Sequence, residues 1–164
     1  MSRSYVAENL DVYDEIKQWS GFKHMITFKE NALKLGLSNL WFGNLAGVDY
    51  LKGENINVVG THHCPEFVYK LLPLALGLDF GHDAKMKYIP IMRNGYQFHF
   101  MTFEDEVLRE FHLWMVESEL EQAVGRARLL RCDCTVNLFS NYPLSQAIMK
   151  DFGYETALMK KKSM

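Results

Sequence analysis

No run of apolar residues in this sequence approaches the ~18 that a membrane-spanning helix needs. The first residues, MSRSYVAENLDVYDE, carry acidic side chains where a secretory signal would be apolar. Cysteine is also scarce, because the chain has only 3, at spacings that match no disulfide framework. These absences predict a cytoplasmic protein with reduced thiols and no membrane partner.

A strong excess of one charge is missing too, since the formal net charge is -2. That value argues against a surface that attracts nucleic acid everywhere, and any nucleic-acid contact should be local. The phosphate-binding pattern G-x-x-x-x-G-K-[ST] does not occur. With 164 residues, 48% of them apolar and 23% charged, the chain fits one globular domain.

Apolar patterns with helical and strand periods alternate along the sequence. The expected helices cover 6–18, 30–34, 66–77 (either kinked at Pro73 or divided into two short helices), 104–115, 118–131 and 143–153. The expected strands cover 24–28, 38–44, 56–60 and 135–140, with a hairpin of 86–92 and 96–103. This alternation predicts an α/β sandwich around a mainly parallel sheet, with the hairpin (about 86–103) as an excursion.

Residues 118–131, SELEQAVGRARLLR, combine a capping box at the start with a glycine inside the expected helix. One stripe of that helix is apolar and should pack on the sheet: Leu120, Ala123, Val124, Ala127 and Leu130. Gly125 would cost about 1 kcal/mol relative to alanine in a helix interior, so it calls for a compensating contact. The arginines beside it are either a solvated face or a phosphate-binding one.

In the same segment Gln122 stands three positions before Gly125 and Arg126, and Arg128 follows. This spacing resembles motif VI of superfamily 2 helicases, in the Gly-Arg-Ala-Arg form of the Dicer-like branch. Residues 42–60 resemble motif V through Gly47 and Asp49, and 24–28 lies where motif IV would fall. The similarity covers about 22–143.

The resemblance implies a RecA-like three-layer sandwich, the carboxy-terminal lobe of a helicase or translocase core, over 22–153. Residues 1–21 would be a helical extension and 154–164 a tail. ATP and Mg²⁺ would bind only when the chain joins an amino-terminal lobe, in cis or in trans, that supplies the phosphate-binding loop. The alternative is a degenerate module that binds DNA, RNA or a partner protein without ATP turnover.

Within that family, the arginines of motif VI stabilise charge that develops on the γ-phosphate. The resemblance therefore implies catalytic roles for Arg126 and Arg128, with Gln122 positioning the nucleotide or the attacking water. It implies nucleotide binding by Gly47, Asp49, Gly125 and Arg131, and in motif V a coupling of the nucleotide to the nucleic-acid track. The second arginine stands two positions after the first, where other branches of the superfamily place it three positions after.

Two further segments carry candidate nucleic-acid contacts. Thr61 and His62 open the segment THHCPE, which is either a phosphate-contacting loop or a plain strand-to-helix turn. Lys87, Arg93 and Tyr96 of the hairpin could hold phosphates and stack bases, or the hairpin aromatics could only pack across strands.

The cysteine and histidine residues suggest two other hypotheses, a zinc site and a catalytic nucleophile. The segments 61–64 (THHC) and 132–134 (CDC) could approach each other at neighbouring strand ends and bind zinc, but the spacing is weak and we assign no metal ligand. Cys64 with a histidine could form a nucleophile pair, although no supporting motif accompanies it.

Overall fold

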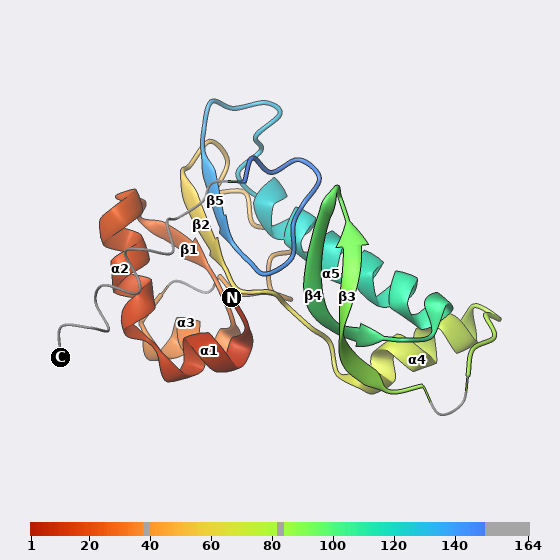
Figure 1. The fold of residues 1–164 in the computed structure, drawn as a ribbon. Coiled ribbons are helices and arrows are strands. Elements are labelled where there is room, and N and C mark those ends of the chain that lie inside the picture. The colour runs from red at the N-terminus through yellow and green to blue at the C-terminus, as the bar shows by residue number, and fades with distance from the viewer. Residues whose placement is uncertain (38–39, 82–83, 150–164) are drawn as a thin grey trace.

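The computed structural model describes residues 1–37, 40–81 and 84–149 (Figure 1). Five helices and five strands are assigned within these residues. The helices are α1 (Arg3–Glu8), α2 (Asp11–Ser20), α3 (Lys29–Lys34), α4 (Glu66–Ala75) and α5 (Glu106–Gly125). The strands are β1 (His24–Ile26), β2 (Ile56–Val59), β3 (Met86–Arg93), β4 (Tyr96–Phe103) and β5 (Val136–Phe139). No helix among the described residues has the length and apolar character needed to cross a membrane.

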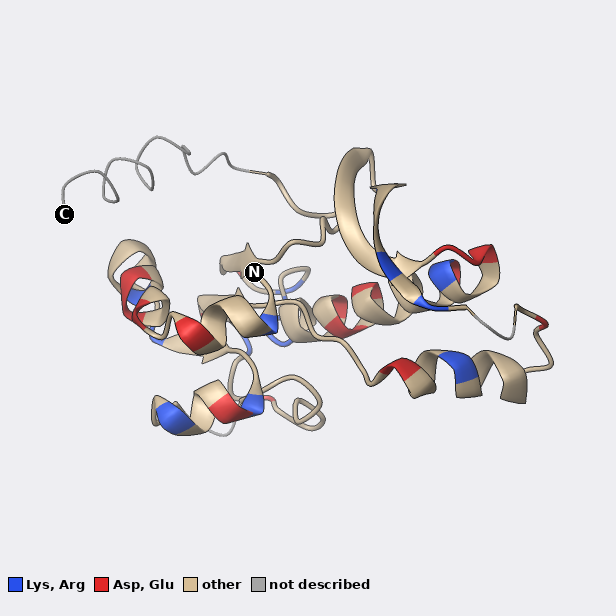
Figure 2. Ribbon diagram, turned by 60° about the horizontal axis from the view of Figure 1, so that its bottom comes forward, with Lys and Arg blue, Asp and Glu red and all other residues tan. Residues whose placement is uncertain are grey.

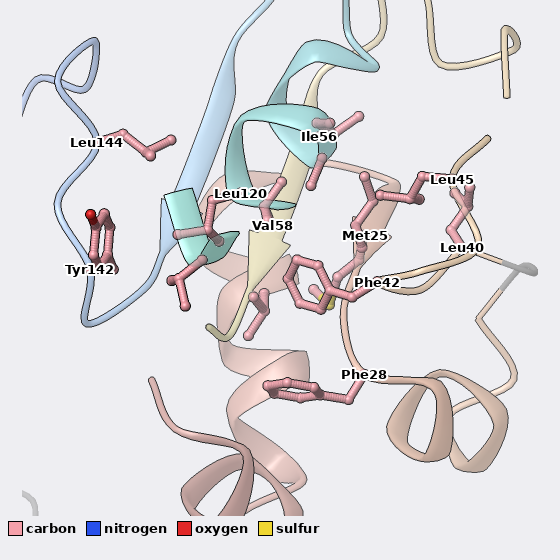
Figure 3. Close-up of a cluster of buried hydrophobic side chains, with 14 of the residues drawn as sticks. Met25, Phe28, Leu40, Phe42, Leu45, Ile56, Val58, Leu120, Tyr142 and Leu144 are labelled. Carbon is pink, nitrogen blue, oxygen red and sulfur yellow. The ribbon is translucent and has the colours of Figure 1, made fainter. Parts of the chain in front are cut away.

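A three-stranded parallel sheet with the order β1-β2-β5 forms the centre of the fold. Helices lie on both of its faces. On one face the amide of Asn57 in β2 donates to the Ser20 hydroxyl at the end of α2, at 2.9 Å. On the other face Ile56 and Val58 lie beside Leu120 of α5 (Figure 3). The predicted α/β class with a parallel sheet is therefore confirmed.

The main hydrophobic core fills the space around this sheet. Ile56, Val58 and Leu120 are fully buried, and Val6 and Tyr13 from the first two helices join the same cluster. The segment 1–21 thus contributes to the core of the sheet rather than standing apart from it. A smaller cluster of Tyr69, Phe103 and Leu108 lies where α4, the hairpin and α5 meet.

The hairpin of β3 and β4 is the second sheet, antiparallel, with Arg93 paired to Tyr96 across the turn. Asn94 and Gly95 both have positive φ, 53° and 80°, as the sequence predicted for a tight Asn-Gly turn. Glu117 of α5 holds this turn. Its carboxylate accepts bonds from the Arg93 guanidinium at 3.0 Å and the Asn94 amide at 2.7 Å.

The prediction of a break at Ser118 is wrong, because α5 is one helix of 20 residues. Its amino end is capped by Asp105, whose side chain accepts from the Leu108 amide. One buried face runs the whole length of the helix, through Leu108, His112, Leu113, Val116, Leu120 and Ala123. Because the core contacts continue past Ser118, the chain gains nothing by ending a helix there.

The carboxyl end of α5 also differs from the prediction. Gly125 is the last helical residue and not an interior one. The apolar stripe therefore stops early: Ala127 is fully buried, but Leu130 is 98% exposed. Arg128, with φ 61°, turns the chain away from the helix axis.

Three other local predictions need correction. The expected strand 38–44 is an isolated bridge between Thr27 and Trp41 followed by turns, and residues 38–39 lie outside the described residues. The expected helix 6–18 is two helices, because the chain leaves the helical conformation at Asn9, with ψ 68°. Residues 143–149 form turns instead of a helix, and 150–164, with Gly153 and the tail, lie outside the described residues.

Candidate functional site

The motif V-like loop and the motif VI-like turn contact each other at the amino end of the parallel strands. Arg128 donates to the Asp49 carboxylate at 3.2 Å, across 79 residues of chain. The Gly53 amide donates to the Ala127 carbonyl oxygen at 3.0 Å. The turn residue Gly47, with φ 71°, precedes Asp49 on the same loop. The structure thus places two of the predicted segments in direct contact.

Arg128 holds a left-handed conformation that costs a residue with a side chain of order 1–3 kcal/mol. Its carbonyl oxygen accepts from the amides of Arg131, at 2.8 Å, and Cys132, at 3.0 Å, which closes the turn. The ion pair with Asp49 and this turn keep the strained conformation in place. Strain of this kind in a surface turn is typical of functional sites.

Arg126 and Gln122 share one face of the end of α5, four residues apart. Gln122 is exposed, and Arg126 is half-buried. The Nε of Arg126 is shielded from solvent and has no hydrogen-bond partner among the described residues. An arginine that is partly desolvated and unpaired can grip an anionic oxygen strongly, because such a contact replaces a missing hydrogen bond.

Glu119 continues this face of α5 toward the segment 61–64. Its Oε2 atom is buried and also lacks a partner within the described part of the chain. His62 is close enough for the Glu119 charge to act on it. Burial lowers the pKa of His62 and the nearby Arg3 adds to that effect, while Glu119 opposes it. Glu119 and Arg126 on α5, and His62 in the segment 61–64, each have one buried atom without a hydrogen-bond partner among the described residues.

A groove of about 1500 Å³ borders the other side of the motif VI-like turn. Its lining includes Gly125, Arg128 and Arg131 together with Tyr96 from the hairpin. A Cβ atom added to Gly125 would meet nothing within 4 Å. The glycine thus faces open space and not the closely approaching backbone that an interior helix position would have required.

The remaining predicted nucleic-acid contacts are engaged within the chain. Thr61 is buried at the carboxyl end of β2, where its hydroxyl bonds to Ser140 and Asn141. Lys87 pairs with Glu104. Arg93 pairs with Glu110 at 2.9 Å and with Glu117 at 3.0 Å. The structure therefore brings Asp49 into contact with Arg128, and it leaves the two basic hairpin residues bound to carboxylates.

A histidine pair that the sequence did not reveal lies where the segment 61–64, α5 and β4 meet. His63 Nδ1 and His112 Nε2 are 3.2 Å apart, and His112 Nδ1 is 2.9 Å from the Thr102 hydroxyl. Burial lowers the pKa of His63 to about 4 and that of His112 to about 3. The charge of His62 further lowers the pKa of His63, and the charge of His63 further lowers the pKa of His112, so both are neutral near pH 7. The only signal in the sequence was the HH dipeptide, because His112 sits on a helix far along the chain.

The two segments considered for zinc lie at opposite ends of the parallel sheet. Residues 132–134 precede β5, whereas 61–64 follow β2, so parallel strands hold them apart. Within residues 1–37, 40–81 and 84–149, no three His, Cys, Asp or Glu side chains are grouped to hold a metal ion. Burial raises the pKa of the Cys64 thiol, and its amide donates to the Tyr69 hydroxyl at 2.6 Å. A raised pKa makes a thiol a poorer nucleophile at neutral pH.

Comparison with protein-family models, with curated proteins and with solved structures finds no match for this chain. The function must therefore be inferred from the residues of the site.

Proposed function

We propose that this chain is the second RecA-like lobe of a superfamily 2 DNA or RNA helicase or translocase. It supplies arginines to ATP and Mg²⁺ held by a separate amino-terminal lobe. The observation that carries the proposal is the contact between the motif V-like loop and the motif VI-like turn, through Asp49 and Arg128. Both segments precede paired parallel strands, β2 and β5, so they lie at the same edge of the sheet, and the Asp49–Arg128 ion pair joins the two sequences that resemble helicase motifs.

The two arginines take different roles in this proposal. Arg128 is already held by Asp49, with side chains 45% and 77% exposed, so it links the loop to the turn. Arg126 has its Nε desolvated and unpaired, so it is the one available to the γ-phosphate. Gln122, exposed one helical turn earlier on the same face, is placed to orient the nucleotide or the attacking water. Mg²⁺, which the other lobe would hold, would neutralise charge on the phosphates of ATP.

Reconstitution tests this proposal. The chain is mixed with, or fused to, an amino-terminal RecA-like lobe that carries the phosphate-binding lysine, and ATP hydrolysis is measured with and without single-stranded DNA or RNA. We expect stimulated hydrolysis, and a loss of roughly 10³-fold or more with Arg126→Ala, the usual worth of an arginine finger. Arg109→Ala is the matched control, since Arg109 lies in the first turn of α5 and its side chain donates a hydrogen bond only to the Glu104 carbonyl oxygen among the described residues.

Two results would contradict the proposal. One is the absence of nucleic-acid-stimulated hydrolysis with every lobe tried. The other is a rate for Arg126→Ala equal to that of the control. A further measurement distinguishes the proposed enzyme from a module that binds nucleic acid without ATP turnover. It is the binding of a labelled single-stranded oligonucleotide to the chain alone, followed by fluorescence anisotropy. Binding without any reconstituted turnover would favour a module that only holds nucleic acid.

A further inference from the structure

Helix α4 presents an apolar stripe to solvent. Phe67, Leu71 and Leu74 are 65%, 61% and 60% exposed, and their spacing of four and three residues places them on one face. Leu76 and Leu78, just beyond the helix, are exposed as well. Exposed apolar side chains are ordinary when single, but several that gather on one helix face form a patch, and the largest such patch of a protein is often functional.

The opposite side of α4 is already occupied, so the stripe is not the face that packs on this chain. Tyr69 and Pro73 are buried there, and the Tyr69 ring lies 4.3 Å from the His112 ring of α5. The helix is therefore apolar on both sides. A helix of that kind is normally buried on every side, which leaves the outer stripe of α4 without its partner.

The charges on α4 do not favour a partner of either sign. Glu66 and Lys70 are the only charged residues of α4 (Figure 2). They pair with each other at 2.7 Å. The stripe is consequently neutral, so two copies of it can approach without repulsion between like charges. An acidic or basic partner would find no complementary charge on this helix.

The area of the stripe agrees with the needs of a stable dimer. From their exposed fractions, Phe67, Leu71, Leu74 and the exposed leucines around them offer on the order of 400 Å² of apolar surface per copy. A standard interface buries about 800 Å² on each partner, roughly 60% of it apolar. The stripe thus supplies most of the apolar area that one side of such an interface requires.

We infer that α4 is the self-association surface of this protein, where a second copy of the chain packs its own α4 stripe. A two-fold dimer uses the same patch on both copies, which a single neutral apolar stripe permits. The surface is separate from the arginine turn, so the inference does not depend on the proposed helicase function.

Sedimentation equilibrium of the full chain tests the inference. We expect a monomer–dimer equilibrium for the wild type, and a dimer weakened about 100-fold or more by Leu71→Glu with Leu74→Glu, because the charges would lie at the centre of the interface. The matched control is Leu33→Glu with Leu130→Glu, two exposed leucines on α3 and on the arginine turn. This control should dimerise like the wild type.

Circular dichroism and thermal unfolding keep the result interpretable. All four substitutions are at side chains exposed in one copy, so each variant should remain folded. A second variant, Phe67→Ala, removes an aromatic anchor without adding charge and should weaken the dimer less. A wild type that stays monomeric at the highest measurable concentration would overturn the inference. So would a dimer that the α4 substitutions leave unchanged.

Discussion

Arg128 and Asp49 form an ion pair at 3.2 Å although 79 residues separate them in the chain. Both side chains are substantially exposed, at 45% and 77%. Water and salt screen such a pair, so its direct contribution to stability is small. Its value lies in fixing the arginine turn against the neighbouring loop.

The first prediction concerns this pair. A double-mutant cycle with Asp49→Ala and Arg128→Ala should give a coupling energy below about 1 kcal/mol in urea unfolding. In the reconstituted ATPase, the double variant should lose no more activity than the worse single variant, because the two residues act as a unit. Additive losses in ATPase activity would mean that the two side chains work separately.

Gly125 is the subject of the second prediction. Gly125→Ala should leave the free energy of unfolding unchanged or raise it by up to about 1 kcal/mol, since a Cβ there meets nothing and alanine favours the helix. Gly95→Ala is the comparison. Gly95 has φ 80°, which a residue with a Cβ adopts only with strain, so this variant should be less stable than the wild type. If Gly125→Ala is stable but lowers the reconstituted ATPase activity, the space beside the arginines belongs to a ligand. A clear loss of stability would show that the glycine is structural.

The third prediction addresses the close approach of Gly60 to Phe28. Gly60 has φ 109°, and a Cβ at this position would lie 2.7 Å from the Cζ atom of the Phe28 ring. Both overpacking and backbone strain oppose Gly60→Ala, so we expect a loss of about 2 kcal/mol or more in denaturant unfolding.

Gly43→Ala serves as the control for Gly60→Ala. Gly43 also has a positive φ, 80°, but a Cβ there meets nothing within 4 Å. It should therefore show only the conformational part of the loss. Equal losses at the two positions would mean that the Phe28 ring moves aside at little cost.

Acid stability provides the fourth prediction. The folded-state pKa values of His63, about 4, and His112, about 3, lie below the unfolded value of ~6.5. The unfolded chain therefore binds more protons as the pH falls, and stability decreases with it. The loss should begin near pH 6.5, reach on the order of 3 kcal/mol for each histidine by pH 4, and be absent above pH 7.

His63→Gln tests this prediction, because it removes one of the two titrating groups and should flatten the profile between pH 6.5 and 4. His99→Gln, at an exposed position on β4, should leave the slope as it is. Denaturant unfolding across this pH range provides the measurement. A slope that His63→Gln does not change would assign the acid sensitivity to other groups.

The sequence predicted best those elements whose signal is local. The Asn94-Gly95 turn needs only its own positive φ values, and the β-branched run of β2 needs only burial on both faces. The end of α5 was predicted poorly, because helical periodicity alone extends the apolar stripe to Leu130. The helix instead ends at Gly125, and Arg128 turns toward Asp49, a contact that sequence spacing cannot report.

The candidate site follows the same division. The resemblance brought Gln122, Arg126 and Arg128 forward from one segment, and the structure adds Glu119 on the same face of the helix. The sequence predicted a helix start at the stretch ESELE, which contains Glu119. The structure shows instead that this stretch lies inside α5, which begins at Glu106. His112 gave no signal because its partners, His63 and Thr102, come from other elements.

The continuity of α5 has a mechanical consequence. At 1.5 Å per residue, its 20 residues form a rod of about 30 Å. One end of the rod carries Arg126, and its earlier turns carry Glu117, which grips the hairpin, and His112, which contacts α4. A stiff rod tilts as a unit, so a displacement of the arginine end also moves its attachments to the hairpin and to α4.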